Sequence, residues 1–295
     1  NITVFGTSAK FIAACQEAEV SPIKNHNLNR MRTILSTGSP LVEENYDYIY
    51  KDVKNDVMLS SISGGTDLIS CFVLGNPMLP VYRGEIQCRG LGMAVESYDK
   101  NGEFNFNQKG ELVCKIAFPS MPIYFWNDGN GDKYNQAYFS TYPNIWHHGD
   151  YILINNHGGI VIYGRSDATL NPGGVRIGTA EIYRVIDNFS EISDSLVVSQ
   201  DWYEDERIIL FIKLTQDKTL SDGLIDNIKL TIKKSCSPRH VPAIILETDD
   251  IPYTISGKKV EIAVKKIING EKIKNKDALA NPQSLDLYRN IKELQ

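Results

Sequence analysis

The feature that most constrains the fold is a change in the hydrophobic pattern near Asp167. From about residue 80 to 165, short apolar runs alternate with turns rich in Asp, Asn and Gly, as in strands joined by tight turns. After Asp167, helical spacing of apolar residues alternates with strand-like runs, and Thr179 is expected to cap the first helix, with Glu181 in its first turn. The predicted helices cover residues 182–189, 224–232 and 260–268, and the predicted strands cover residues 195–199, 207–215 and 243–247. The pattern predicts a β-rich region followed by a compact α+β domain.

The region before residue 80 has a mixed pattern. Residues 8–20 place apolar side chains at helical spacing, which predicts a helix. Short apolar runs at residues 33–35 and 57–59 end in Ser, Thr and Gly, as strands that lead into loops do. In the β-rich region we expect further strands at residues 93–98, 111–118, 151–154 and 160–163.

Composition excludes several classes of protein. With 295 residues, 42% hydrophobic and 23% charged, the chain can hold one large domain or two ordinary ones. The formal net charge of -5 gives no electrostatic reason to expect nucleic acid or an anionic membrane as partner, and no apolar stretch is long enough to span a bilayer. The first residues lack the pattern of a secretory signal, and the cysteines are far apart, without a C-x-x-C pair. We therefore expect a cytoplasmic protein with reduced thiols.

Three polar runs carry the chemistry. Residues 252–259 read Pro-Tyr-Thr-Ile-Ser-Gly-Lys-Lys, a tight turn with Lys258 at its tip. A lysine held there is a point cation on a flexible stem, suited to a phosphate or a carboxylate. Residues 163–176 contain a Gly-Arg-Ser-Asp segment and a pair of glycines, and residues 146–150 read Trp-His-His-Gly-Asp. Each run alone is also typical of a solvated turn, so the inference depends on all of them occurring in this order.

Two further loops follow predicted strands. Residues 36–40 read Ser-Thr-Gly-Ser-Pro, and residues 61–67 read Ser-Ile-Ser-Gly-Gly-Thr-Asp. Glycine lets the backbone approach a flat ligand, a threonine hydroxyl can donate to a phosphate oxygen, and an aspartate can hold Mg²⁺. Simple polar turns are the alternative for both loops. His147 and His148 have no metal partner at ligand spacing, and we interpret them as structural.

Together these runs resemble the acyl-adenylate-forming enzymes, the superfamily of acyl-CoA synthetases, peptide-synthetase adenylation domains and luciferases. The resemblance extends from end to end of the chain and corresponds to the C-terminal half or so of such an enzyme. It implies a mixed α+β and α/β fold in which residues 1–166 form the C-terminal part of the AMP-binding large domain. About residues 80–165 of that part would be a β-rich, barrel-like subdomain. Residues 168–295 would form a small, mobile α+β lid domain, with the hinge at Asp167.

The resemblance also assigns residues to the nucleotide. For ATP or AMP it indicates Gly38, Ser39, Pro40, Ser61, Ile62, Ser63, Gly64, Gly65, Thr66, Asp150, Arg165 and Arg176. The loop with Gly38 would pack against adenine, Asp150 would hold the ribose hydroxyls, and Arg176 would contact the α-phosphate. Asp67 is the expected metal ligand for Mg²⁺, and it is shorter than the glutamate that is usual in the family.

Catalysis and coenzyme A binding are assigned to the region after Asp167. Gly173 and Gly174 would form the wall of a narrow channel for the pantetheine arm of coenzyme A. Lys233 would lie near the CoA nucleotide, although a solvated helix lysine is the simpler interpretation. Lys258 aligns with the catalytic adenylation lysine, whose charge would offset the repulsion between a carboxylate and the α-phosphate.

Gly64 is the clue to the carboxylate substrate. Acetyl-CoA synthetases of the superfamily carry a bulky aromatic residue at this position, and its loss would open volume beside the acyl group. The closest resemblance is to members that act on acetoacetate, so we expect ATP-dependent ligation of acetoacetate to coenzyme A. Acetate or propionate as substrate, a non-catalytic nucleotide-binding fragment, and an adenylation domain that serves a carrier protein remain the alternatives. The family's phosphate-binding loop is absent from these residues, so we expect the 295-residue chain alone to lack adenylation activity.

Overall fold

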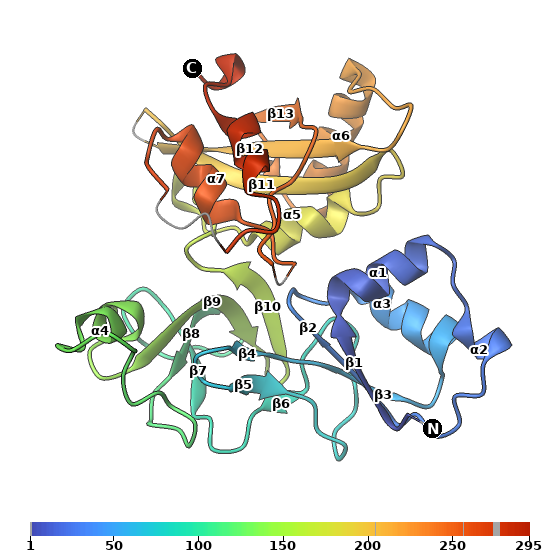
Figure 1. The fold of residues 1–295 in the computed structure, drawn as a ribbon, viewed down its shortest axis with the longest axis vertical. Helices are drawn as coiled ribbons and strands as arrows, with labels where there is room; N and C mark the ends of the chain where they lie inside the picture. The colour runs from blue at the N-terminus through green and yellow to red at the C-terminus, as the bar shows by residue number, and fades with distance from the viewer. Residues whose placement is uncertain (1, 204, 256, 274–277) are drawn as a thin grey trace. The chain divides into compact units, whose positions relative to one another are not determined.

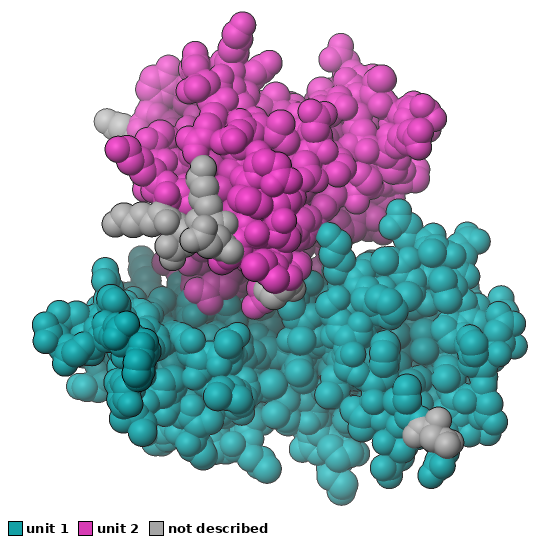
Figure 2. All heavy atoms as spheres, in the orientation of Figure 1, with its two compact units in different colours: residues 1–163 teal, residues 164–295 magenta. Residues whose placement is uncertain are grey.

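The computed structural model describes residues 2–203, 205–255, 257–273 and 278–295. The chain forms two compact units, residues 1–163 and 164–295 (Figure 2). Each unit has two hydrophobic core clusters among its described residues. The predicted hinge, Asp167, lies within the first residues of the second unit, and its role as a hinge stays a prediction. Ser256, in the predicted lysine turn, lies outside the described residues.

The first unit begins with a three-stranded parallel sheet in the order β1-β2-β3. Its strands are β1 (Val4–Ser8), β2 (Thr33–Thr37) and β3 (Met58–Ser61), and its helices are α1 (Ala9–Glu17), α2 (Pro22–Asn25) and α3 (Glu43–Tyr48), which continues as a π-helix at Ile49–Val53. α1 begins after Ser8, whose Oγ accepts a hydrogen bond from the backbone N–H of Phe11 at 3.1 Å. Ile12, Ile34 and Leu59 share one core, and the predicted helix and both predicted strands are confirmed.

The rest of the first unit is β-rich, as predicted (Figure 1). It contains two sheets. The first has the order β4-β5-β6, with β4 (Ser63–Gly65), β5 (Ser70–Leu74) and β6 (Cys88–Arg89). The second has the order β10-β9-β8-β7, with β7 (Val95–Tyr98), β8 (Lys109–Cys114), β9 (Trp146–Ile154) and β10 (Ile160–Arg165). In the part of the chain that is described, both sheets are open rather than closed on themselves. α4 (Asp132–Tyr138) precedes β9. Phe72 of β5, Leu112 of β8 and Trp146 of β9 are fully buried in one core, which the two sheets share.

The second unit is the predicted α+β domain (Figure 1). Its elements are α5 (Thr179–Ile186), β11 (Ile192–Trp202), β12 (Asp205–Leu214), α6 (Asp222–Ser235), β13 (Ile244–Glu247) and α7 (Glu261–Ile268), with short 3-10 helices at Pro172–Gly174, Pro238–His240, Pro282–Tyr288 and Lys292–Leu294. β12 pairs antiparallel with β11 and parallel with β13. Leu210 of β12 shares a core with α5 and α6, and the next residue, Phe211, shares the opposite core with α7 and Tyr288. Because both faces of the sheet are covered, the centres of its two long strands are apolar runs, residues 196–198 in β11 and 208–212 in β12. The predicted helices and strands of this region are confirmed.

The start of α5 corrects one prediction. The N-cap residue is Gly178, and Thr179 is the first residue of the helix, with 4% of its surface exposed. Oε1 of Glu181 accepts a hydrogen bond from the backbone N–H of Gly178 at 3.0 Å. The glutamate in the first turn therefore anchors the helix start, and no side-chain cap at Thr179 is needed.

Among the helices in the described ranges, none is both long and apolar enough to cross a bilayer.

Candidate functional site

The loops that follow β2 and β3 lie next to each other. Ser36 of β2 pairs with Ser61 of β3, and the backbone N–H of Ile62 donates to the carbonyl of Ser36 at 2.9 Å. Both loops leave the carboxyl ends of parallel strands, which is where open α/β sheets bind ligands. Gly38 has a φ of +94°, a left-handed conformation that favours glycine, and it is exposed together with Ser39, whereas Pro40 is half-buried.

Asp150 joins this group from a distant part of the sequence. Ser63 Oγ donates to Asp150 Oδ2 at 3.4 Å, across 87 positions of the chain. Asp150 lies within β9 and has 8% of its surface exposed. The structure therefore brings the predicted ribose ligand against the predicted phosphate-binding segment.

His148 packs under the same segment. Its Nε2 lies 3.3 Å from the carbonyl oxygen of Gly64, and its Nδ1 lies 3.4 Å from Nε1 of Trp146, which is a donor. Because Nε1 of Trp146 donates, Nδ1 is the acceptor, and Nε2 also faces Oδ2 of Asp150 at 3.8 Å. The ring also meets Phe72 edge to face, with centroids 4.8 Å apart. Within the described residues, no group of three or more His, Cys, Asp or Glu side chains could hold a metal ion, and the structural role of His147 and His148 stays a prediction.

Gly64 has no space beside it for a side chain. A Cβ atom at this position would overlap the carbonyl oxygen of Ser70 and lie 2.7 Å from Cα of Cys71, on the neighbouring strand β5. Glycine is thus required by the close approach of two backbones at an irregular point of the β4–β5 pair. This geometry does not support the interpretation that Gly64 opens volume for a longer acyl group.

Thr66 and Asp67 are exposed at the end of this loop. Tyr138 of α4, which the sequence had not indicated, donates its hydroxyl hydrogen to Oδ2 of Asp67. The Tyr138 ring stacks on Trp146 with centroids 3.6 Å apart and an interplanar angle of 15°. The stacked ring holds the phenol in place, so the orientation of the Asp67 carboxylate is set by the core below it.

The glycine loop of the second unit is held by charged side chains. Gly173, in the 3-10 helix Pro172–Gly174, has a φ of +59°. Its backbone N–H donates to both carboxylate oxygens of Asp205, at 3.0 and 2.9 Å, and its carbonyl accepts from Nη1 of Arg239 at 3.4 Å. Asp205 and Arg239 were not predicted, because no local pattern links them to the loop. Gly174 belongs to the same helix.

The other predicted residues of this unit lie at its surface. Nε of Arg165 is 3.3 Å from Oδ1 of Asp167, and their side chains are 47% and 50% exposed. Arg176 is exposed beyond the glycine loop, and Lys233 is exposed in the last turn of α6. The exposure of Lys233 agrees equally with a CoA contact and with a solvated lysine.

Lys258 projects from a closed turn. Tyr253 pairs with Lys259 across the turn. Inside it, the backbone N–H of Thr254 donates to the carbonyl of Lys258 at 2.8 Å, and the N–H of Lys258 donates to Oγ1 of Thr254 at 3.0 Å. Gly257 has a φ of +80°, as a tight turn requires. Lys258 is exposed, so this turn presents its ammonium group to solvent.

Glu261, at the start of α7, makes the stability of the second unit depend on pH. Its partly buried carboxylate accepts a hydrogen bond from the Tyr183 hydroxyl at 3.1 Å. Burial raises the pKa of Glu261 above its ordinary value, although the Tyr183 bond acts in the opposite direction. The folded state therefore binds this proton more tightly than the unfolded state, and stability falls as pH rises from the unfolded-state pKa through the folded-state pKa.

We expect Glu261→Gln to stabilise the second unit at about pH 7, by at most about 1 kcal/mol. The uncharged amide avoids the free-energy cost of burying the ionised carboxylate. The advantage should shrink as the pH falls through about 4 and vanish well below it, where the parent carboxyl is protonated in both states. Thermal denaturation, monitored by circular dichroism at several pH values, measures the stability difference between the variant and the parent. Glu271→Gln, at an exposed position, is the matched control, and an equal loss of stability at every pH would contradict the expectation.

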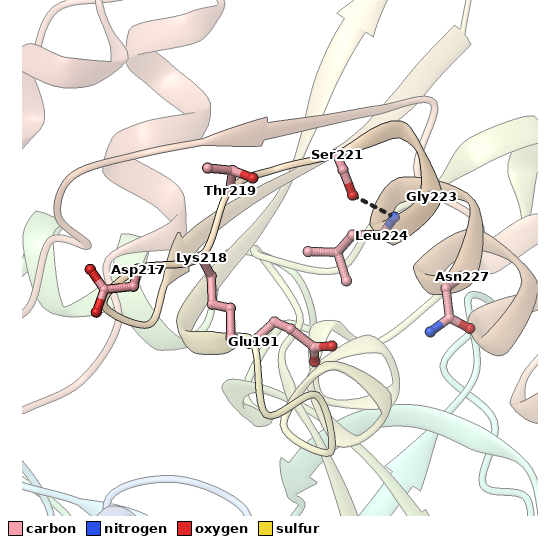
Figure 3. A pocket seen from close by; sticks show the side chains of 8 residues that line it. All are labelled: Glu191, Asp217, Lys218, Thr219, Ser221, Gly223, Leu224 and Asn227. Atoms are coloured by element: carbon pink, nitrogen blue, oxygen red, sulfur yellow. Dashed lines mark hydrogen bonds between the residues drawn. The ribbon is translucent and has the colours of Figure 1, made fainter.

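A separate pocket lies at the start of α6 (Figure 3). Its volume is about 400 Å³, and it is lined by Glu191, Asp217, Lys218, Thr219, Ser221, Gly223, Leu224 and Asn227. None of the predicted site residues is among them. Ser221 caps α6 by accepting a hydrogen bond from the N–H of Leu224 at 3.2 Å, which explains its presence structurally. The predicted site residues of each unit lie in the loops described above, away from the lining of this pocket.

Comparisons with known proteins give a consistent result, although no protein-family model matches the chain. The acetoacetyl-CoA synthetase of Danio rerio is 54% identical over 296 residues, which is 100% of this chain and 44% of that protein. The acetoacetyl-coenzyme A synthetase of Rhizobium meliloti (strain 1021) is 53% identical over 292 residues, which is 99% of this chain and 45% of that protein.

Solved structures extend the comparison to the fold. The structure of acetoacetyl-CoA synthetase from Streptomyces lividans matches with a TM-score of 0.89 and 40% identity, over 97% of this chain and 44% of that one. A benzoate CoA ligase from Burkholderia xenovorans LB400 shares the fold at a TM-score of 0.71 and 22% identity, over 89% of this chain and 51% of that one. The chain thus spans less than half the length of the acetoacetyl-CoA synthetases that it matches. Over essentially its whole length, in sequence and in fold, this chain is similar to part of an acetoacetyl-CoA synthetase.

Proposed function

We propose that the protein containing these residues ligates acetoacetate to coenzyme A at the expense of ATP, through an acyl-adenylate intermediate. The observation that carries the proposal is that 53–54% of residues are identical to those of two acetoacetyl-CoA synthetases over 99–100% of this chain, a span that contains the exposed turn with Lys258. The adjacent loops after β2 and β3, with Asp150 beside them, support a nucleotide site in the first unit.

In the first half-reaction, a carboxylate oxygen of acetoacetate attacks the α-phosphorus of ATP, and pyrophosphate leaves. Two anions must approach each other, and Lys258 supplies the positive charge that stabilises the crowded phosphorus. Arg176 would contact the same phosphate, and Asp150 would hold the ribose through two carboxylate oxygens. In the second half-reaction, the CoA thiol attacks the acyl carbonyl and AMP leaves, with the backbone of Gly173 and Gly174 lining the path of the pantetheine arm.

Mg²⁺ would accompany the nucleotide. This ion commonly uses one or two carboxylates together with substrate phosphates, so a single protein ligand suffices. Asp67 fits that requirement, because it is exposed and Tyr138 fixes the orientation of its carboxylate. Bound there, Mg²⁺ would neutralise phosphate charge. The chain's own contribution is the fixed position of the carboxylate.

The substrate assignment is tested with the protein that the complete open reading frame encodes. We expect CoA-dependent release of AMP with acetoacetate to exceed that with acetate or propionate by at least about tenfold in kcat/KM, a discrimination of about 1.4 kcal/mol. Reactions without CoA provide the control for simple ATP hydrolysis. Faster turnover of acetate or propionate would contradict acetoacetate as the substrate, and tight AMP binding without any turnover would favour a non-catalytic nucleotide-binding protein.

A further inference from the structure

One carboxylate binds both arms of the turn that carries Lys258. Asp194, on β11, accepts a hydrogen bond at Oδ2 from the hydroxyl of Tyr253, at 2.5 Å. Its other oxygen, Oδ1, lies 3.0 Å from Nζ of Lys259. Tyr253 precedes the tip of the turn and Lys259 follows it, and the two residues pair with each other. Asp194 therefore connects the base of the turn to the central sheet from both sides.

The surroundings strengthen this connection. The side chains of Lys259 and Asp194 are only 22% and 19% exposed, so water screens their ion pair less than it would at the surface. Nζ of Lys259 also donates to the carbonyl of Ser195 and lies 4.2 Å from the centroid of the Tyr183 ring. Burial, followed by the charge of Asp194, raises the pKa of Tyr253, so the phenol keeps its hydrogen and remains a donor at neutral pH.

This arrangement also distinguishes two adjacent lysines. Lys259 pairs with Tyr253 and its side chain reaches Asp194 and the carbonyl of Ser195 on β11, whereas Lys258 belongs to the turn. Lys259 is half-buried and Lys258 is exposed, in agreement with this geometry. Asp194 attracts the ammonium group of Lys259 and so determines which lysine the turn presents to solvent.

We propose that Asp194 is a positioning residue for the adenylation step: by holding Tyr253 and Lys259, it fixes the place and direction of Lys258. This inference rests on the proposed function, in which Lys258 stabilises the transition state at the α-phosphorus. A small displacement of such a group has a large kinetic effect, and a shift of about 1 Å can reduce the rate by about 100-fold. The thioester-forming step does not use Lys258, so it should be insensitive to Asp194.

The test measures the two half-reactions separately in the complete open reading frame. We expect Asp194→Asn to slow acetoacetate-dependent ATP–pyrophosphate exchange by at least about tenfold, mainly in kcat, because the amide cannot replace the ion pair with Lys259. Thioester formation from a supplied acyl-adenylate should stay within about twofold of the parent. Asp201→Asn, an exposed carboxylate on the same strand, is the matched control and should change neither rate. Tyr253→Phe releases only one arm and provides a milder variant if Asp194→Asn folds poorly.

A double variant separates positioning from general damage. If Asp194 acts through Lys258, then adding Asp194→Asn to Lys258→Ala should slow adenylation no further. Unchanged exchange in both Asp194→Asn and Tyr253→Phe, or an equal fall in both half-reactions, would overturn the inference. If Lys258→Ala itself left exchange intact, the proposed function would fail, which is a result distinct from a failure of Asp194 alone.

Discussion

Replacing Lys258 with alanine in the complete open reading frame is expected to slow acyl-adenylate formation by about 100- to 1000-fold, or about 2.7–4 kcal/mol of transition-state stabilisation. The reason is electrostatic, because the exposed ammonium group of Lys258, in a closed turn, would offset repulsion between the carboxylate and the α-phosphate. ATP–pyrophosphate exchange with acetoacetate measures this step directly.

Lys266→Ala is the matched control for that experiment. Lys266 is an exposed lysine on α7 of the same unit, and its removal changes the net charge equally. We expect it to leave exchange within about twofold of the parent, as surface substitutions usually do. If Lys258→Ala and Lys266→Ala behaved alike, general electrostatics would explain the effect, and Lys258 would not be the catalytic residue.

Gly64→Ala is expected to destabilise the first unit by about 3 kcal/mol, at the upper end of the usual cost of overpacking. The added methyl group would overlap the carbonyl oxygen of Ser70, and backbone atoms cannot rotate away as a flexible side chain can. Denaturant unfolding of the 295-residue chain should show a lower midpoint with an unchanged slope.

Gly129→Ala serves as the comparison, because a Cβ at Gly129 would meet no atom within 4 Å. We expect its midpoint to match that of the parent. A normal midpoint for Gly64→Ala would mean that β5 can move aside, and the interpretation of Gly64 as a gap beside the acyl group would then regain support. Gly64→Trp could then be tested for a shift of activity toward acetate.

The second unit was largely predictable from its sequence. β11 and β12 are long, buried on both faces and flanked by amphipathic helices, so apolar periodicity locates them well. The shortest strands of the first unit, β4 and β6, span three and two residues and carry no periodic pattern, so they were missed. The cap of α5 was misplaced by one residue, because Glu181 anchors the backbone of Gly178 without help from a side chain at the cap.

The sequence by itself determined the chemistry available at each loop and the local form of the lysine turn, in which Thr254 and Lys258 bond to each other. Only the tertiary structure decided why Gly64 must be glycine, which residues hold Gly173, and that Lys259 rather than Lys258 faces the sheet. The physical reason is the range of the interactions. Turn hydrogen bonds join near neighbours in the chain, whereas the contacts of Gly173 with Asp205 and of Lys259 with Asp194 join residues far apart in the sequence.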